Sequence, residues 1–182
     1  MPRRGRDRYN LTMADRRDPP STTTSEAASG RAIDDLAMLD RFAAELAGPA
    51  RVGDVFALSG ELGAGKTALA RSFISALARR EGVEAPEDVP SPTFTLMQEY
   101  DIGALRVFHF DLYRLKNADE ALELGVEDAC SEGVALIEWP DRLGPWLPRD
   151  RVDVRLAIVG EGRRRAEVVA RGRAAERYGA LQ

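Results

Sequence analysis

Residues 55–67 read VFALSGELGAGKT, and this stretch decides the fold. Its first part, VFAL at 55–58, is a short apolar run that predicts a buried strand. The second part, GELGAGKT at 60–67, fits the pattern G-x-x-x-x-G-K-[ST] at every fixed position. From Ala68 to Arg79, apolar residues share one face at helical spacing, so a helix follows the loop directly. A strand, a glycine-rich loop and a helix in this order predict a phosphate-binding loop.

The composition makes an accidental match improbable, since this chain would produce the pattern by chance in roughly one case in a thousand. The chain holds two lysines, Lys66 and Lys116, amid 24 arginines. A lysine kept inside the motif indicates a site that requires a compact ammonium group rather than a guanidinium. The alternative interpretation is a glycine-rich turn that merely joins strand to helix.

Each fixed residue of the loop has a chemical reason to be there. Glycines at 60, 63 and 65 allow the backbone to wrap a phosphate with its N–H groups pointing inward. The start of the following helix adds its dipole to the same anion. We expect Lys66 to neutralise the β- and γ-phosphates and the Thr67 hydroxyl to ligate Mg²⁺.

Two acids are candidates for the surroundings of the metal. Asp111 follows the apolar run VFHF at 107–110, and Glu138 follows VALI at 134–137. Carboxyl ends of parallel strands meet at the edge of a sheet where α/β folds bind ligands. We therefore expect at least one of the two carboxylates near Mg²⁺, although either could be a solvated strand end.

Further elements complete an α/β pattern. A hairpin is indicated where Gly160-Glu161-Gly162 separates two alternating runs. The predicted elements outside the loop region are a helix over 32–47, strands over 93–100 and 105–110, a short helix over 118–124, a strand over 134–137, and hairpin strands over 152–159 and 165–170.

The chain has 182 residues, which suits one domain. With one cysteine, Cys130, and one histidine, His109, it excludes an internal disulfide and leaves almost no basis for a zinc site or a Cys-His hydrolase. No apolar run approaches the ~18 residues of a membrane span, and no secretory signal is visible. We expect a cytoplasmic protein.

The net charge of −4 is unevenly spread. Residues 1–25 and 160–182 each carry +3, so the body between them carries −10. An acidic body argues against a broad nucleic-acid interface. The basic ends could touch RNA or an acidic partner, or be solvated tails.

Four segments in order, GELGAGKT at 60–67, SPTFTL at 91–96, HFDLYRL at 109–115 and IEWPDRL at 137–143, together resemble the TsaE (YjeE-type) family. That family is the small ATPase of the bacterial machinery that makes N6-threonylcarbamoyladenosine in tRNA. The resemblance covers 32–159, about 70% of the chain. The loop at 60–67 alone would fit many families, whereas the other three segments in this order are specific.

The resemblance implies a role for each matching position. It makes Lys66, Asp111 and Glu138 the catalytic residues, with Thr67, Glu138 and Asp111 around the metal, Asp111 lying close to the attacking water or the metal's water shell. Residues 91–95 would form a switch-like loop near the γ-phosphate. The implied nucleotide contacts are Gly60, Glu61, Leu62, Gly63, Ala64, Gly65, Lys66, Thr67, Ala68, Thr93, Thr95 and Trp139.

For three neighbouring side chains, the sequence allows either a functional or a structural role. Trp139 lies beside the nucleotide or partner, or is a core aromatic. His109 is a satisfied core histidine or a functional one. Arg114 reaches phosphate or forms a structural salt bridge. The sequence departs from the family in two places: it lacks a clear apolar first strand, and its loop over 81–89 is long and acidic.

We thus expect an α/β protein with the three-layer P-loop NTPase fold, a mostly parallel central sheet and a C-terminal β-hairpin. The expected ATPase domain spans 26–170, with tails at 1–25 and 171–182. With ATP and Mg²⁺ it would reset the TsaB–TsaD complex between turnovers and meet tRNA only indirectly. The alternatives are a small P-loop kinase, a GTPase, for which no N-K-x-D motif is present, and a non-enzymatic ATP-binding switch.

Overall fold

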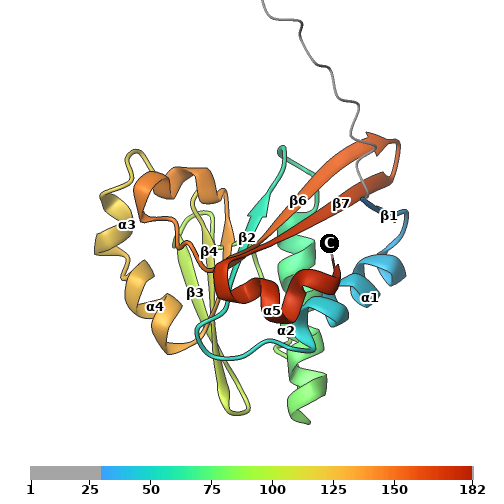
Figure 1. The fold of residues 1–182 in the computed structure, drawn as a ribbon, viewed down its shortest axis with the longest axis horizontal. Coiled ribbons are helices and arrows are strands. Elements are labelled where there is room, and N and C mark those ends of the chain that lie inside the picture. The colour runs from blue at the N-terminus through green and yellow to red at the C-terminus, as the bar shows by residue number, and fades with distance from the viewer. Residues whose placement is uncertain (1–29, 182) are drawn as a thin grey trace, which may run out of the picture.

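The computed structural model describes residues 30–181, in which seven strands form one mixed sheet between two layers of helices (Figure 1). The strands are β1 (Arg31–Ile33), β2 (Val55–Ser59), β3 (Met97–Ile102), β4 (Leu105–Asp111), β5 (Val134–Glu138), β6 (Arg151–Gly160) and β7 (Arg163–Arg171). The α-helices are α1 (Leu36–Ala47), α2 (Lys66–Glu81), α3 (Glu120–Glu123), α4 (Val126–Glu132) and α5 (Ala175–Tyr178). The 3₁₀ segments are η1 (Pro140–Trp146), η2 (Gly172–Ala174) and η3 (Gly179–Leu181).

The strand order is β1-β7-β6-β2-β5-β4-β3. The central strands β6, β2, β5 and β4 are parallel, whereas β1, β7 and β3 add antiparallel pairs at the two sides. Strands β6 and β7 form the C-terminal hairpin, visible as the long orange arm in Figure 1. The expected three-layer α/β architecture is confirmed, with parallel pairing confined to the centre of the sheet.

The middle of the sheet is buried on both faces. Along β2, β4 and β5, successive side chains enter opposite cores, as the two-residue period of a strand requires. In β5, Leu136 belongs to the core under α1 and α2, and Ile137 to the core under α3, α4 and η1. The parallel register sets Asp111 opposite Glu138, and Glu138 opposite Leu58. Both candidate acids therefore emerge at the same carboxyl edge, beside the start of α2.

The N-terminal part of the described chain differs from expectation. Residues 31–33 pair with β7 as a short strand, whereas the sequence predicted a helix from 32 and no first strand. The helix begins only at Leu36, because Asp35 caps it by accepting a hydrogen bond from the Met38 amide at 2.7 Å. Residues 1–25, which the sequence predicts to be a tail, lie outside the described residues.

Two further elements also differ. The strand predicted from 93 begins at 97, because Leu96 adopts a left-handed backbone conformation (φ 65°) and residues 93–96 turn instead. The helix predicted over 118–124 is shorter, and a second helix, α4, follows it after Gly125 (φ 67°). A left-handed glycine ends one helix and starts the next, which apolar spacing alone does not reveal.

The C-terminal residues expected to be a tail instead pack against the body as far as Leu181. The Tyr178 side chain is fully buried, and its hydroxyl donates a hydrogen bond to Asp54 at 2.8 Å. The Arg177 guanidinium also pairs with Asp54. A buried carboxylate needs such partners, so these contacts hold the segment in place. Among residues 30–181, no helix combines the length and apolar character needed to cross a membrane.

Candidate nucleotide site

The loop between β2 and α2 is shaped by glycines with positive φ, a backbone conformation that other residues rarely adopt. Gly60 has φ +139°, and a Cβ atom there would lie 2.2 Å from the Leu156 carbonyl oxygen. Gly65 has φ +104° and precedes the first residue of α2. The space in front of Gly65 is open, since a Cβ atom there would meet nothing within 4 Å. The loop therefore forms an open backbone cradle at a helix N-terminus, the arrangement that binds phosphate.

Lys66 is held inside this cradle. Its Nζ atom donates to the backbone oxygens of Gly60 and Glu61, both at 2.9 Å, and lies 3.9 Å from the centre of the Trp139 ring. Burial lowers the pKa of Lys66 from its ordinary value, while the nearby carboxylates of Glu138 and Asp111 oppose that shift. An ammonium group folded back onto the loop is placed to meet an anion entering it.

Thr67 and Glu138 form the polar contact at the start of α2. The Thr67 hydroxyl donates to Glu138 Oε2 at 3.1 Å, and the other oxygen, Oε1, lies 2.9 Å from His109 Nε2. Glu138 is buried, and His109 is fully buried. Two hard oxygen donors from separate elements thus lie together beside the loop.

Asp111 faces the loop over 91–96 rather than Thr67. Its Oδ2 atom accepts from the Ser91 hydroxyl at 2.6 Å and the Thr93 hydroxyl at 2.5 Å, and Oδ1 accepts from the Tyr113 amide at 3.1 Å. Burial acts to raise the pKa of Asp111, but these hydrogen bonds outweigh it and lower the pKa below its ordinary value. Asp111 therefore connects the end of β4 to this loop.

Trp139 follows Glu138 in a left-handed conformation (φ 59°), unusual for a residue with a large side chain. Its amide donates to the Leu58 carbonyl at 3.2 Å, and its ring lies 5.0 Å from the Tyr113 ring. Strained residues of this kind concentrate at functional sites. The turn directs the indole over Lys66, so Trp139 lies at the site and not only in the core.

A cavity of about 360 Å³ lies in front of these groups. It is lined by most of the predicted site residues: Leu62, Gly63, Gly65, Lys66, Thr67, Ala68, Thr93, Asp111, Glu138 and Trp139. Tyr113, Arg114 and Ser91 line it as well. Gly60 and Glu61 face a neighbouring cavity, and Ala64 lines the apolar cavity described next. Thr95 is exposed and lines none of these cavities.

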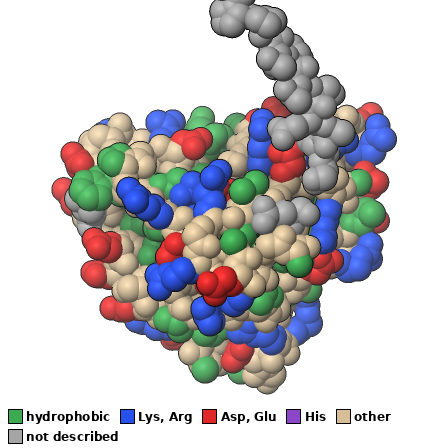
Figure 2. Space-filling view, viewed as in Figure 1, with side chains coloured by type: hydrophobic (Ala, Val, Ile, Leu, Met, Phe, Trp, Pro, Cys, Tyr) green, Lys and Arg blue, Asp and Glu red, His purple; other side chains and the backbone are tan. Residues whose placement is uncertain are grey.

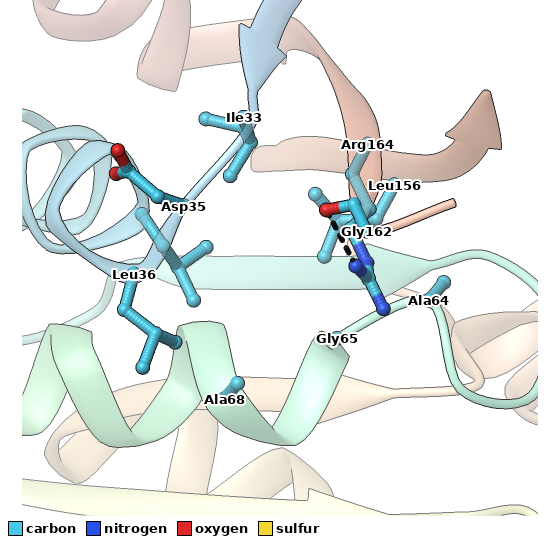
Figure 3. Close-up of a pocket in the computed structure, with 10 residues that line it drawn as sticks. Ile33, Asp35, Leu36, Ala64, Gly65, Ala68, Leu156, Gly162 and Arg164 are labelled. Atoms are coloured by element: carbon cyan, nitrogen blue, oxygen red, sulfur yellow. Dashed lines mark hydrogen bonds between the residues drawn. The ribbon is translucent and has the colours of Figure 1, made fainter. Parts of the chain in front are cut away.

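An apolar cavity of about 220 Å³ adjoins the phosphate loop, and the sequence did not reveal it (Figure 3). It shares Gly65 and Ala68 with the first cavity and takes its apolar wall from Ile33 and Leu36. Arg164, from the β6–β7 hairpin, borders the cavity. Its guanidinium donates hydrogen bonds to the carbonyl oxygens of Gly162 at 2.9 Å and Gly63 at 3.4 Å. The cavity forms only where β1 and the β6–β7 hairpin meet the phosphate loop and α2, and no local sequence pattern predicts that contact.

The central parallel strands, the glycine cradle at the start of α2, and the acids at the carboxyl edge define a protein of the P-loop NTPase class. Residues 33–166 match the family model described as threonylcarbamoyl adenosine biosynthesis protein TsaE. The chain belongs to this TsaE family.

Relatives and a solved structure agree with this assignment. The tRNA threonylcarbamoyladenosine biosynthesis protein TsaE of Bacillus subtilis is 36% identical over 124 residues, 68% of this chain and 73% of that protein. The protein of the same name from Nostoc is 38% identical over 121 residues, 64% of this chain and 70% of the relative. The crystal structure of Bacillus subtilis YdiB superposes with a TM-score of 0.65 at 28% identity, covering 84% of this chain and 92% of the other.

Proposed function

We propose that this chain binds and hydrolyses ATP with Mg²⁺ in the cytoplasm, and that this hydrolysis serves the formation of N6-threonylcarbamoyladenosine in tRNA. It would act with the TsaB–TsaD complex and reset it between rounds. The convergence of Lys66, Thr67 and Glu138 on one cavity at the start of α2 carries the proposal. The relatives named above supply the link to tRNA modification.

The donor set fits Mg²⁺. Thr67 and Glu138 offer a hydroxyl and a carboxylate oxygen, the hard ligands that this ion prefers. Within residues 30–181, no three His, Cys, Asp or Glu side chains gather as a complete metal cluster. Mg²⁺ at phosphate sites completes its shell with water and substrate oxygens, so Thr67 and Glu138 would suffice as protein ligands. When bound, the ion would neutralise charge on the phosphates.

The chain's own groups would divide the remaining work. Lys66 would exchange the carbonyls of Gly60 and Glu61 for the β- and γ-phosphates, while the amides at the start of α2 hold the same anion. Asp111 would act near the attacking water, on the side of the loop over 91–96. The base would enter the apolar cavity of Figure 3, since that cavity shares Gly65 and Ala68 with the phosphate cavity.

Exposed apolar side chains near the site support a dependence on partners. Leu62, which lines the phosphate cavity, is 73% exposed, and Phe94, in the loop tied to Asp111, is 83% exposed. Exposed apolar groups gathered at a site are typical of a surface that another protein covers. A partner there would exclude water and order residues 91–95. TsaB and TsaD are the partners we propose.

We propose that tRNA meets the complex through those partners. The body between the basic ends carries a net charge of −10. On the face that Figure 2 shows, basic and acidic side chains intermingle and no broad basic surface forms. Proteins that hold nucleic acid across a wide face gather arginine and lysine on it, and this face does not.

A reconstituted tRNA modification assay tests the proposal directly. We expect sustained, multiple-turnover product with the wild-type chain and little after the first round with K66A. Lys116, the other lysine, is exposed and lies outside the cavity, so K116A is the matched control and should behave as wild type. Product that continues unchanged when the chain is omitted, or with K66A, contradicts the proposal.

ADP release measured without any acceptor separates an ATPase from a kinase. Within the described residues the segment after β5 is the short η1 rather than a helical lid, which does not favour the kinase.

A further inference from the structure

The single histidine of the chain is fully buried next to the metal-side acid. His109 lies in β4, and its Nε2 atom is 2.9 Å from Glu138 Oε1. Its other ring nitrogen, Nδ1, has no hydrogen-bond partner among the described residues. Burying an imidazole is costly unless it is hydrogen bonded, so the contact with Glu138 is what compensates this placement.

The sheet register brings the two side chains together. Strands β4 and β5 are parallel, with His109 opposite Leu136 and Asp111 opposite Glu138. Residues two apart on a strand share a face, so His109 and Glu138 project toward α2 as diagonal neighbours. Each oxygen of Glu138 then has a separate partner, His109 for Oε1 and Thr67 for Oε2. The carboxylate is fixed at both ends.

The hydrogen bonds also determine which ring nitrogen carries the proton. An ionised carboxylate only accepts hydrogen bonds, and a carboxylate that ligates a metal is ionised. The proton must therefore sit on Nε2 for His109 to donate to Glu138. In a neutral ring Nδ1 is then a bare acceptor, and leaving it without a partner is less costly than burying an unpaired N–H. The orphaned Nδ1 thus agrees with the direction of the contact.

We propose that His109 is a positioning residue for Glu138. By holding Oε1, it keeps Oε2 directed at Thr67, where the metal of the proposed ATPase reaction would be ligated. This inference rests on the proposed function. Partners that orient metal ligands typically change metal affinity by about 10–100-fold when they are removed. His109 touches neither nucleotide nor metal in this scheme and acts through Glu138 alone.

Calorimetry with ADP, in the presence and absence of Mg²⁺, tests the inference without relying on turnover. We expect H109L to lose about tenfold or more of the affinity that Mg²⁺ adds to ADP binding, while Mg²⁺-free ADP affinity is unchanged. In H109Q the amide nitrogen replaces Nε2 as donor, so the variant should recover most of that gain. F110L is the matched control, because Phe110 is buried in the same strand but faces the opposite core.

Nitrogen-15 NMR of the tag-free protein gives a second readout, since one histidine gives one imidazole. We expect a proton on Nε2 and none on Nδ1, in the free protein as isolated. The reverse tautomer overturns the inference even if H109L fails to fold. So does wild-type Mg²⁺ coupling in a folded H109L, or an equal loss of coupling in F110L. If the ADP affinity of the wild-type chain is the same with and without Mg²⁺, the proposed function is contradicted, and this inference fails with it.

Discussion

Thr67 and Glu138 stand 71 positions apart in the chain, yet the hydroxyl of one donates to the carboxylate of the other at 3.1 Å. The sheet makes this contact, because β2 and β5 run parallel with Leu58 opposite Glu138, and α2 begins one short loop beyond β2. The two oxygen donors are thus brought together by backbone pairing before any ligand arrives. A site organised in advance spends little of its binding energy on rearrangement.

Replacing Lys66 by alanine should nearly abolish ATP hydrolysis. The ammonium is buried, and within the described residues the cavity holds no second lysine that could move into its place. Losing one electrostatic group of this kind costs about 10²–10³-fold in turnover. Steady-state phosphate release, measured for K66A and for the control K116A, checks this. Wild-type turnover in K66A would mean that this loop is not the site.

The loop itself could be predicted from sequence because it is local. Chain neighbours supply the cradle of 60–67, the strand before it and the helix after it, so a pattern suffices. The joint placement of Asp111 and Glu138 was also predictable, since both follow apolar runs that end at one edge of a sheet. What each acid contacts was not predictable, because that depends on the register between β4 and β5.

Features that are built from segments distant in the chain could not be predicted from the sequence. A strand of three residues is too short to show a sequence pattern, and β1 forms because it pairs with the edge of β7. The apolar cavity needs β1, α1 and the β6–β7 hairpin together. The C-terminal helix is held by Asp54, more than 120 positions away, so its composition alone predicted a tail. In each case tertiary contacts override weak local preference.

The two acids should differ when each is replaced by alanine. E138A should raise the Mg²⁺ concentration that gives half-maximal hydrolysis by at least about 10–100-fold, because it removes a metal-side oxygen and partners that only orient such a ligand already contribute that much. D111A should lower turnover while ATP affinity stays close to wild type, because Asp111 contacts Ser91 and Thr93 rather than Thr67. Magnesium titrations of hydrolysis, with ATP binding measured alongside, distinguish the two. Identical behaviour would refute the division of roles, although not the site.

ATP should bind more tightly than GTP. The loop carries no guanine-selecting motif, and the cavity beside it is walled by apolar side chains from β1 and α1. Leu36 lines this cavity and is 73% exposed, so it is free to cover a base. L36S should weaken ATP binding by about 5–30-fold, since covering such a side chain contributes ~1–2 kcal/mol. Binding of tripolyphosphate, which has no base, should not change. Calorimetry that gives tighter binding of GTP than of ATP would refute this placement of the base. So would an L36S variant that loses as much affinity for tripolyphosphate as for ATP.

The C-terminal contact should make the protein less stable at alkaline pH. Burial, followed by the negative charge of Asp54, raises the pKa of Tyr178 well above its ordinary value of 10.0, while Arg177 opposes the shift. The folded chain therefore keeps the phenol proton at a pH where the unfolded chain releases it. Because the unfolded state then binds fewer protons, the free energy of unfolding falls as pH rises through about 10.

Y178F removes this titration and, at neutral pH, costs about 1 kcal/mol for the lost hydrogen bond to Asp54. Its stability should approach that of wild type as pH rises from 8 to 11, because only the wild type loses the contribution of the phenol. Urea unfolding at intervals of half a pH unit measures both slopes. Y113F is the control, since Tyr113 is 43% exposed, and its slope should follow wild type. If Y178F and wild type lose stability in parallel across this range, the buried phenol does not set the alkaline limit.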